Sequence, residues 1–100
     1  MGAFEQTRRG FALSHYRFPE VMDYRAAPQI AKALNALKGA DLIIDGSQVS
    51  RLSTRGAEVC LAAQAQWKVD GHKLHFASWS APAREALERL GLFSKLIQEA

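Results

Sequence analysis

Two adjacent hydroxyl groups, on Ser53 and Thr54, stand where a polar loop gives way to a helical pattern. Either residue can supply the N-cap oxygen for the first free amides of that helix. Backbone N–H groups and the helix dipole also favour negative charge at a helix start. Capping alone explains a Ser-Thr pair at this position, and a phosphate on Thr54, or on Ser53 beside it, would sit in a favourable field.

Metal and nucleotide chemistry have weaker support. His72 and His75 flank the start of a predicted strand, where their spacing points the rings to opposite faces, and no further ligands follow at zinc-site spacing. The segment Asp45-Gly46-Ser47 has a single glycine and lacks the lysine of a phosphate-binding loop. We therefore expect no metal and no cofactor.

Catalysis would need titratable groups that converge. Thr54 has no identifiable base to activate it as a nucleophile. Asp41 and Asp45 bracket one predicted strand, and at about 3.3 Å per residue their carboxylates are more than about 10 Å apart, which is wide for a glycosidase pair. Their simpler interpretation is a strand start and a turn. We expect the chain not to be an enzyme.

These residues depend on one strand and one helix for their positions. Leu42, Ile43 and Ile44 form a short apolar run bounded by Asp41 and by Asp45-Gly46, which predicts a buried strand ending in a turn. A helix is then predicted from Thr54 or Arg55 to about Val69. One stripe of that helix is apolar, namely Gly56, Cys60, Ala63 and Trp67 with Val59 beside it.

The opposite side of this helix carries little charge. It consists of Glu58, Ala62, Ala65 and Gln66. A solvated face normally carries more charge, so this one could receive a partner. Alanine also simply favours helix, and the sequence leaves both interpretations open.

Further elements alternate along the chain. Residues 10–18 read as an opening strand at a sheet edge, ended by Pro19. A helix capped by Asp23 is predicted to start near residues 24–27 and to end at Lys38-Gly39. Then follow a strand over residues 73–78, a helix opened by Ser80 with Ala83, Ala86, Leu87 and Leu90 facing inward, and a last amphipathic turn with Phe93, Leu96 and Ile97. This alternation predicts an α/β fold with helices packed on a sheet.

Length and composition are those of one domain. The 100 residues suit a flexible leader over residues 1–10 and a single domain over residues 11–100. Net charge is +3, but basic residues are scattered among acidic ones without interleaved aromatics, so we expect no nucleic-acid partner. No apolar stretch is long enough to insert in a bilayer, and the lone Cys60 favours a reducing cytoplasm.

The central stretch resembles the signature of STAS domains, the fold of bacterial anti-sigma factor antagonists. Asp45, Thr54 and Gly56 match the family pattern of a strand-end Asp followed by Asp-Ser/Thr-small-Gly at the second helix. Ser53 replaces the second Asp of the pattern, and Arg55 stands where a small residue is usual. The resemblance extends weakly over residues 19–92.

This resemblance implies a small, mostly parallel or mixed β-sheet with helices mainly on one side. It also implies a non-enzymatic regulatory module that docks an anti-sigma factor, a serine-kinase-like protein or a chemotaxis component, with phosphorylation of Thr54 as the switch. The implied partner-binding residues are Asp45, Ser47, Ser53, Thr54, Arg55, Gly56 and Glu58.

Two alternatives stay open. Other members of the family are subunits of lipid-transport ABC ATPases, so the partner could be such an ATPase component. The chain could also be a small-ligand-binding α/β domain whose site lies at the carboxyl ends of the strands.

Overall fold

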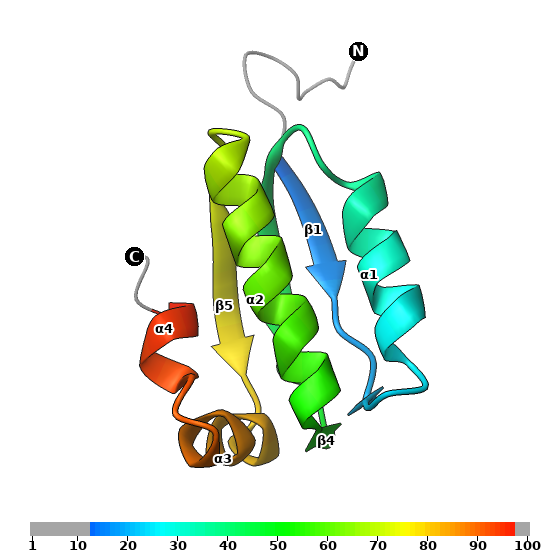
Figure 1. Ribbon diagram of the computed structural model, residues 1–100, viewed down its shortest axis with the longest axis vertical. Helices are drawn as coiled ribbons and strands as arrows, with labels where there is room; N and C mark the ends of the chain where they lie inside the picture. The colour runs from blue at the N-terminus through cyan, green and yellow to red at the C-terminus, as the bar shows by residue number, and fades with distance from the viewer. Residues whose placement is uncertain (1–12, 98–100) are drawn as a thin grey trace.

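The computed structural model describes residues 13–97 (Figure 1). Strands and helices alternate as the sequence predicts, with two short strands added. The elements are β1 (Leu13–Arg17), β2 (Val21–Met22), α1 (Ala27–Ala36), β3 (Asp41–Gly46), β4 (Arg51–Leu52), α2 (Thr54–Val69), β5 (Leu74–Trp79), α3 (Ala81–Arg89) and α4 (Phe93–Ile97). The predicted leader, residues 1–10, lies outside the described residues.

The main sheet has three parallel strands in the order β1-β3-β5. The apolar run of β3 is therefore central, and β1 lies at an edge of the described sheet, as its loose alternation predicts. A second ladder pairs β2 with β4, also in parallel, with Val21 opposite Arg51 and Met22 opposite Leu52. Two residues per strand are too few to leave a periodic pattern, which is why the sequence does not predict them.

The helices cover mainly one face of this sheet. Residues of β3 alternate between half-buried and buried, with Leu42 and Ile44 almost completely buried. Figure 1 shows α2 in front of the sheet, α1 beside β1, α3 beyond the lower end of the sheet and α4 beside β5. His15 and His75, the register partners of Ile43, are exposed. The predicted α/β architecture with one-sided helix packing is confirmed.

The core lies between the sheet and the helices that cover it, and it includes side chains of α1, α2, α3 and α4. It contains the predicted apolar stripe of α2 and the inward-facing residues of β3 and β5. Its largest fully buried side chains are Phe18, Met22, Ile30, Leu42, Ile44, Leu87, Leu96, Val49 and Cys60. Burying side chains of this size stabilises the fold by about 1.5–3 kcal/mol each relative to exposure. Leu96 fixes α4 onto the domain, as its amphipathic pattern predicts.

Two details of the helices differ from expectation. Asp23 does not cap α1: the N-cap is Ala26, and Asp23 instead accepts the amides of Arg25 and Ala26 in the preceding turn. The helix also ends at Ala36, two residues before Lys38, because the amide of Leu37 bonds to the carbonyl of Leu34 in a tighter turn.

The third helix also differs at its end. Leu90, predicted to face inward, is 38% exposed because α3 ends at Arg89 and the chain turns away at Gly91. The predicted cap is confirmed, since the Ser80 hydroxyl accepts the amide of Ala83.

Within the described residues, no helix is long and apolar enough to cross a membrane.

Candidate functional site

Ser53 anchors the start of α2 to the neighbouring short strand. Its hydroxyl accepts the amide of Gly56 at 3.4 Å and donates to the carbonyl of Met22 at 3.2 Å. Its own amide donates to the same carbonyl at 3.0 Å. Of the two N-cap candidates in the sequence, Ser53 is therefore the one that caps α2, and it also ties the helix start to β2.

Thr54 is the first residue of α2, and its side chain is exposed. Its hydroxyl forms no hydrogen bond with another residue of the described range 13–97, and the same holds for the amides of Thr54 and Arg55. The two hydroxyls thus differ in availability, because that of Ser53 makes two bonds and that of Thr54 makes none within this range.

Gly56 is where α2 touches β2. A Cβ at this position would overlap the carbonyl oxygen of Met22 and would lie 3.0 Å from Leu52 Cδ1 and 3.0 Å from Met22 Cβ. A side chain cannot fit there without moving backbone. Gly56 is therefore a packing requirement of the predicted site rather than a contact residue on its surface.

Asp45 forms a separate polar cluster on the sheet. Its carboxylate accepts the amide of Ser47 at 2.9 Å and the hydroxyl of Ser78 at 3.0 Å, and it pairs with Arg17 Nε at 3.4 Å. Arg17 and Ser78 are its register partners on β1 and β5. The cluster closes the carboxyl end of the sheet on the face that does not carry Leu42 and Ile44.

These partners make Asp45 a stronger acid. Hydrogen bonds from the side chain and backbone of Ser47, and then from Ser78, lower the pKa of Asp45 from 3.8 to about 2, and the charge of Arg17 adds to the effect. Hydrogen bonds to the charged form stabilise it. Asp45 is thus a fixed anion at neutral pH.

The structure divides the predicted partner-binding residues into two groups. Ser53, Thr54, Arg55, Gly56 and Glu58 lie together in the first turns of α2, where Arg55 Nε is 3.5 Å from Glu58 Oε1. Asp45 and Ser47 lie at the end of β3 and in the loop that follows it. Among the described residues, Asp45 has no hydrogen bond or ion pair to α2.

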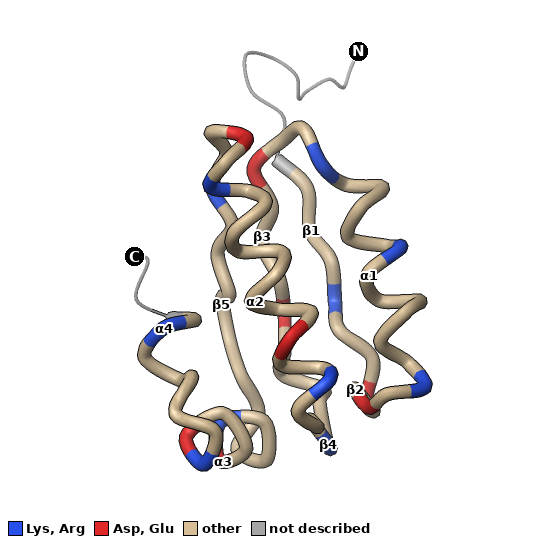
Figure 2. The backbone as a smooth tube through the Cα atoms, viewed as in Figure 1, with Lys and Arg blue, Asp and Glu red and all other residues tan. Residues whose placement is uncertain are grey.

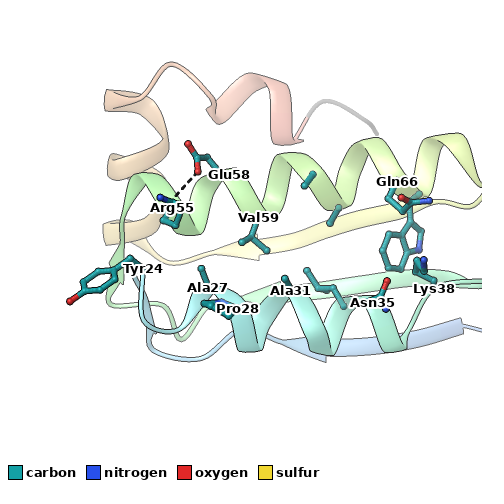
Figure 3. Close-up of a pocket in the computed structure, with 14 residues that line it drawn as sticks. Tyr24, Ala27, Pro28, Ala31, Asn35, Lys38, Arg55, Glu58, Val59 and Gln66 are labelled. Carbon is teal, nitrogen blue, oxygen red and sulfur yellow. Dashed lines mark ion pairs between the residues drawn. The ribbon is translucent and has the colours of Figure 1, made fainter.

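A groove of about 590 Å³ runs between α1 and α2 (Figure 3). Its α2 wall includes Glu58, Ala62 and Gln66, three of the four residues that the sequence singles out as a receptive face; Ala65 does not line it. The full lining is Tyr24, Ala27, Pro28, Ala31, Leu34, Asn35, Lys38, Arg55, Glu58, Val59, Ala62, Ala63, Gln66 and Trp67. Arg55 and Glu58 belong both to this groove and to the α2 start.

The α1 wall of the groove is the part that sequence reasoning does not predict. By helical spacing in the sequence, Asn35 and Lys38 belong to the solvated side of α1, whereas Ala31 belongs to its apolar stripe. The sequence signal that could have pointed to this wall is the run from Tyr24 to Ala40, which contains no acidic residue. It could not reveal which side of α1 would face α2.

The histidines do not form a metal site within the described residues, where no group of three or more His, Cys, Asp or Glu side chains gathers. His72 Nδ1 lies 3.6 Å from Asp41 Oδ1, and the same carboxylate oxygen accepts the amide of Lys73 at 2.9 Å. These contacts join the start of β3 to the start of β5 and are structural.

Comparison with protein-family models and with curated proteins gives no match. Among solved structures, the chain is similar to a sulfate transporter family protein from Wolinella succinogenes. The TM-score is 0.72 at 18% sequence identity, and the match covers 87% of this chain and 73% of that one. The likeness establishes a shared α/β fold, and this fold is consistent with the STAS-like architecture that the sequence predicts.

Proposed function

We propose that this chain is a non-enzymatic docking module of the STAS type, which binds a protein partner at the start of α2. The observation that supports this most directly is the contrast between Ser53 and Thr54. Ser53 holds the helix start in place through Met22, while the neighbouring Thr54 presents an exposed hydroxyl without a partner among residues 13–97. A rigid helix start with an accessible hydroxyl suits a surface that a kinase can modify.

In this proposal, phosphorylation of Thr54 switches partner binding. A phosphate there adds about two negative charges beside free helix amides. Arg55 lies next in the chain and pairs with Glu58, so a phosphate would compete with that carboxylate for the guanidinium. Phosphorylation would rearrange the charges that a partner meets on α2.

The partner of first choice is an anti-sigma factor or a serine-kinase-like protein, as the family resemblance implies. A transport component is the second candidate, because the similar solved structure is a sulfate transporter family protein. A small metabolite is the third, and the α1–α2 groove offers a volume for one.

The test compares baits in lysate of the source cells. Unmodified chain, Thr54→Glu and Thr54→Ala are used for capture, and captured proteins are identified by mass spectrometry. We expect a partner held by the unmodified chain and Thr54→Ala and lost with Thr54→Glu. Equal capture by all three baits would show that negative charge at residue 54 does not control partner binding. Ser94→Glu is the matched control, because it adds the same charge at an exposed position of α4, outside both groups of predicted partner-binding residues.

A thermal-shift screen of nucleotides and metabolites tests the third candidate. A ligand that binds the folded chain at 100 times its Kd stabilises it by about 2.7 kcal/mol. We expect no such shift. A reproducible shift with no protein captured would contradict the docking proposal.

A further inference from the structure

We propose that the groove between α1 and α2 binds an amphipathic helix of the partner protein, with acidic residues along its flank. The inference rests on the proposed function, in that the chain is taken to dock a protein. It concerns the α1–α2 groove, which shares Arg55 and Glu58 with the α2 start and extends from there along both helices.

The groove has the shape for a helix. Its walls are two helices that follow the parallel strands β2 and β4, and four of the fourteen lining residues are alanines: Ala27 and Ala31 from α1, Ala62 and Ala63 from α2. Small side chains let a third helix approach the pair closely, because interaxial distance depends on the side chains at the contact. Figure 3 shows Tyr24 and Arg55 at one end, and Asn35, Lys38 and Gln66 at the other.

The length of the groove fits a short helix. Arg55 and Gln66 both line it and are eleven residues apart on α2, which corresponds to about 16 Å at 1.5 Å per residue. About three turns of a bound helix span that distance. Such a helix places apolar residues at i, i+3 or i+4, and i+7 into the groove, the common spacing of helix-in-groove recognition.

The charges on α1 and α2 indicate which residues the flank of the bound helix should carry. The α1 segment from Tyr24 to Ala40 carries Arg25, Lys32 and Lys38 and no acidic residue. The α2 helix adds Arg55 and Lys68 against a single acid, Glu58. Of these charged residues, Lys38, Arg55 and Glu58 line the groove itself. Figure 2 shows this distribution, with blue alone along α1. Complementary charge steers association and fixes register, so the bound helix should carry Asp or Glu.

Lys38 is the most specific of these cations. It lines the end of the groove and forms no ion pair with another residue in the range 13–97. Arg55, at the other end, is already paired with Glu58. An acidic residue of the bound helix therefore has its natural counter-charge at Lys38.

The experiment uses the full chain expressed in the source cells with a photo-crosslinking amino acid in place of Ala62, an exposed residue of the groove wall. Separate samples carry the same probe at Thr54 or at His75, which is exposed on the sheet face opposite α2. Crosslinked peptides are sequenced. We expect the Ala62 probe to join a protein segment with helical apolar spacing and at least one Asp or Glu on its flank.

Charge reversal makes the test specific. Lys38→Glu should lower the Ala62 crosslink yield about fivefold, since it replaces an attraction with a repulsion at a partly exposed pair. Lys95→Glu, on α4 outside the groove, is the matched control and should leave the yield unchanged. Circular dichroism and melting temperature confirm that both variants fold.

Several outcomes overturn the inference: an Ala62 crosslink to a lipid, to a segment without helical spacing or to a basic helix, or none above the His75 background. If Thr54 captures a partner and Ala62 does not, the groove inference fails while the docking function stands. If Ala62 captures an acidic helix and Thr54 captures nothing, the groove stands and docking at the α2 start fails. Absence of both crosslinks rejects both.

Discussion

Gly56 of α2 packs directly against the backbone of Met22 in β2, so closely that a Cβ would overlap the Met22 carbonyl oxygen. The same carbonyl accepts the hydroxyl and the amide of Ser53. One peptide group of a two-residue strand therefore sets both the position and the capping of the α2 start. The surface that we propose for docking depends on this junction.

Gly56→Ala should destabilise the chain. Alanine improves helix propensity by about 1 kcal/mol, but the overlap with Met22 forces backbone to move. We expect a net loss of about 1–3 kcal/mol in the free energy of unfolding, measured by urea titration. Ala65→Ser, at an exposed position of the same helix, should change it by less than about 0.5 kcal/mol. Unchanged stability of Gly56→Ala would show that the contact is looser than described.

Ser53 has two functions that substitution can separate. Ser53→Ala removes the N-cap and the bond to Met22, with an expected loss of about 1–2 kcal/mol. Ser53→Asp keeps a capping oxygen but places a carboxylate against the Met22 carbonyl, so we expect it not to restore stability. If Ser53→Asp restored full stability in urea titration at neutral pH, Ser53 would stabilise the fold only as an N-cap and not through its bond to Met22.

Thr54→Glu should not unfold the protein. A negative side chain at the first helical position interacts favourably with free amides and the helix dipole, which contributes about 0.3–1 kcal/mol at low salt. We expect a slight rise in melting temperature for Thr54→Glu and a slight fall for Thr54→Lys, with both effects reduced in high salt. Destabilisation by Thr54→Glu would mean that loss of a partner in the capture experiment reports unfolding instead.

Asp45 should make stability depend on acidity. Because its pKa is about 2 in the folded chain against 3.8 ordinarily, the unfolded chain binds more protons between these values. The stabilisation is complete above about pH 4 and is lost as pH falls through about 2. Asp45→Asn should therefore flatten the decline in unfolding free energy over that range. Ser94→Ala, at an exposed position of α4 without an acidic group, serves as the control and should leave the slope as it is.

The thiol of Cys60 should be unreactive in the folded chain. It is completely buried, and burial raises the pKa of its thiol from 9.0 to about 12. The thiolate is the reactive form, so a thiol-specific disulfide reagent should react at the rate of unfolding rather than at that of an exposed cysteine. Stability should fall as pH rises from about 9 towards 12, because only the unfolded chain then releases the proton. Fast labelling under native conditions would contradict this burial.

The sequence by itself determines the order and type of the main elements and much of the core. The apolar run of β3, the stripe of α2 and the caps at Ser53 and Ser80 are local patterns, and local patterns survive folding when packing agrees with them. Gly71 and Gly91, which stand just after α2 and α3, adopt the positive φ that glycine accepts readily.

Only the tertiary structure decides which of the predicted residues meet. Asp45 and Thr54 lie nine positions apart within one motif, yet sheet alternation directs Asp45 towards Arg17 and Ser78 while Thr54 stands on the helix. Ladders of two residues, such as β2 with β4, lack a period that a sequence could display. The groove arises because parallel strands set α1 beside α2, and that neighbourhood is a property of the sheet order rather than of either helix.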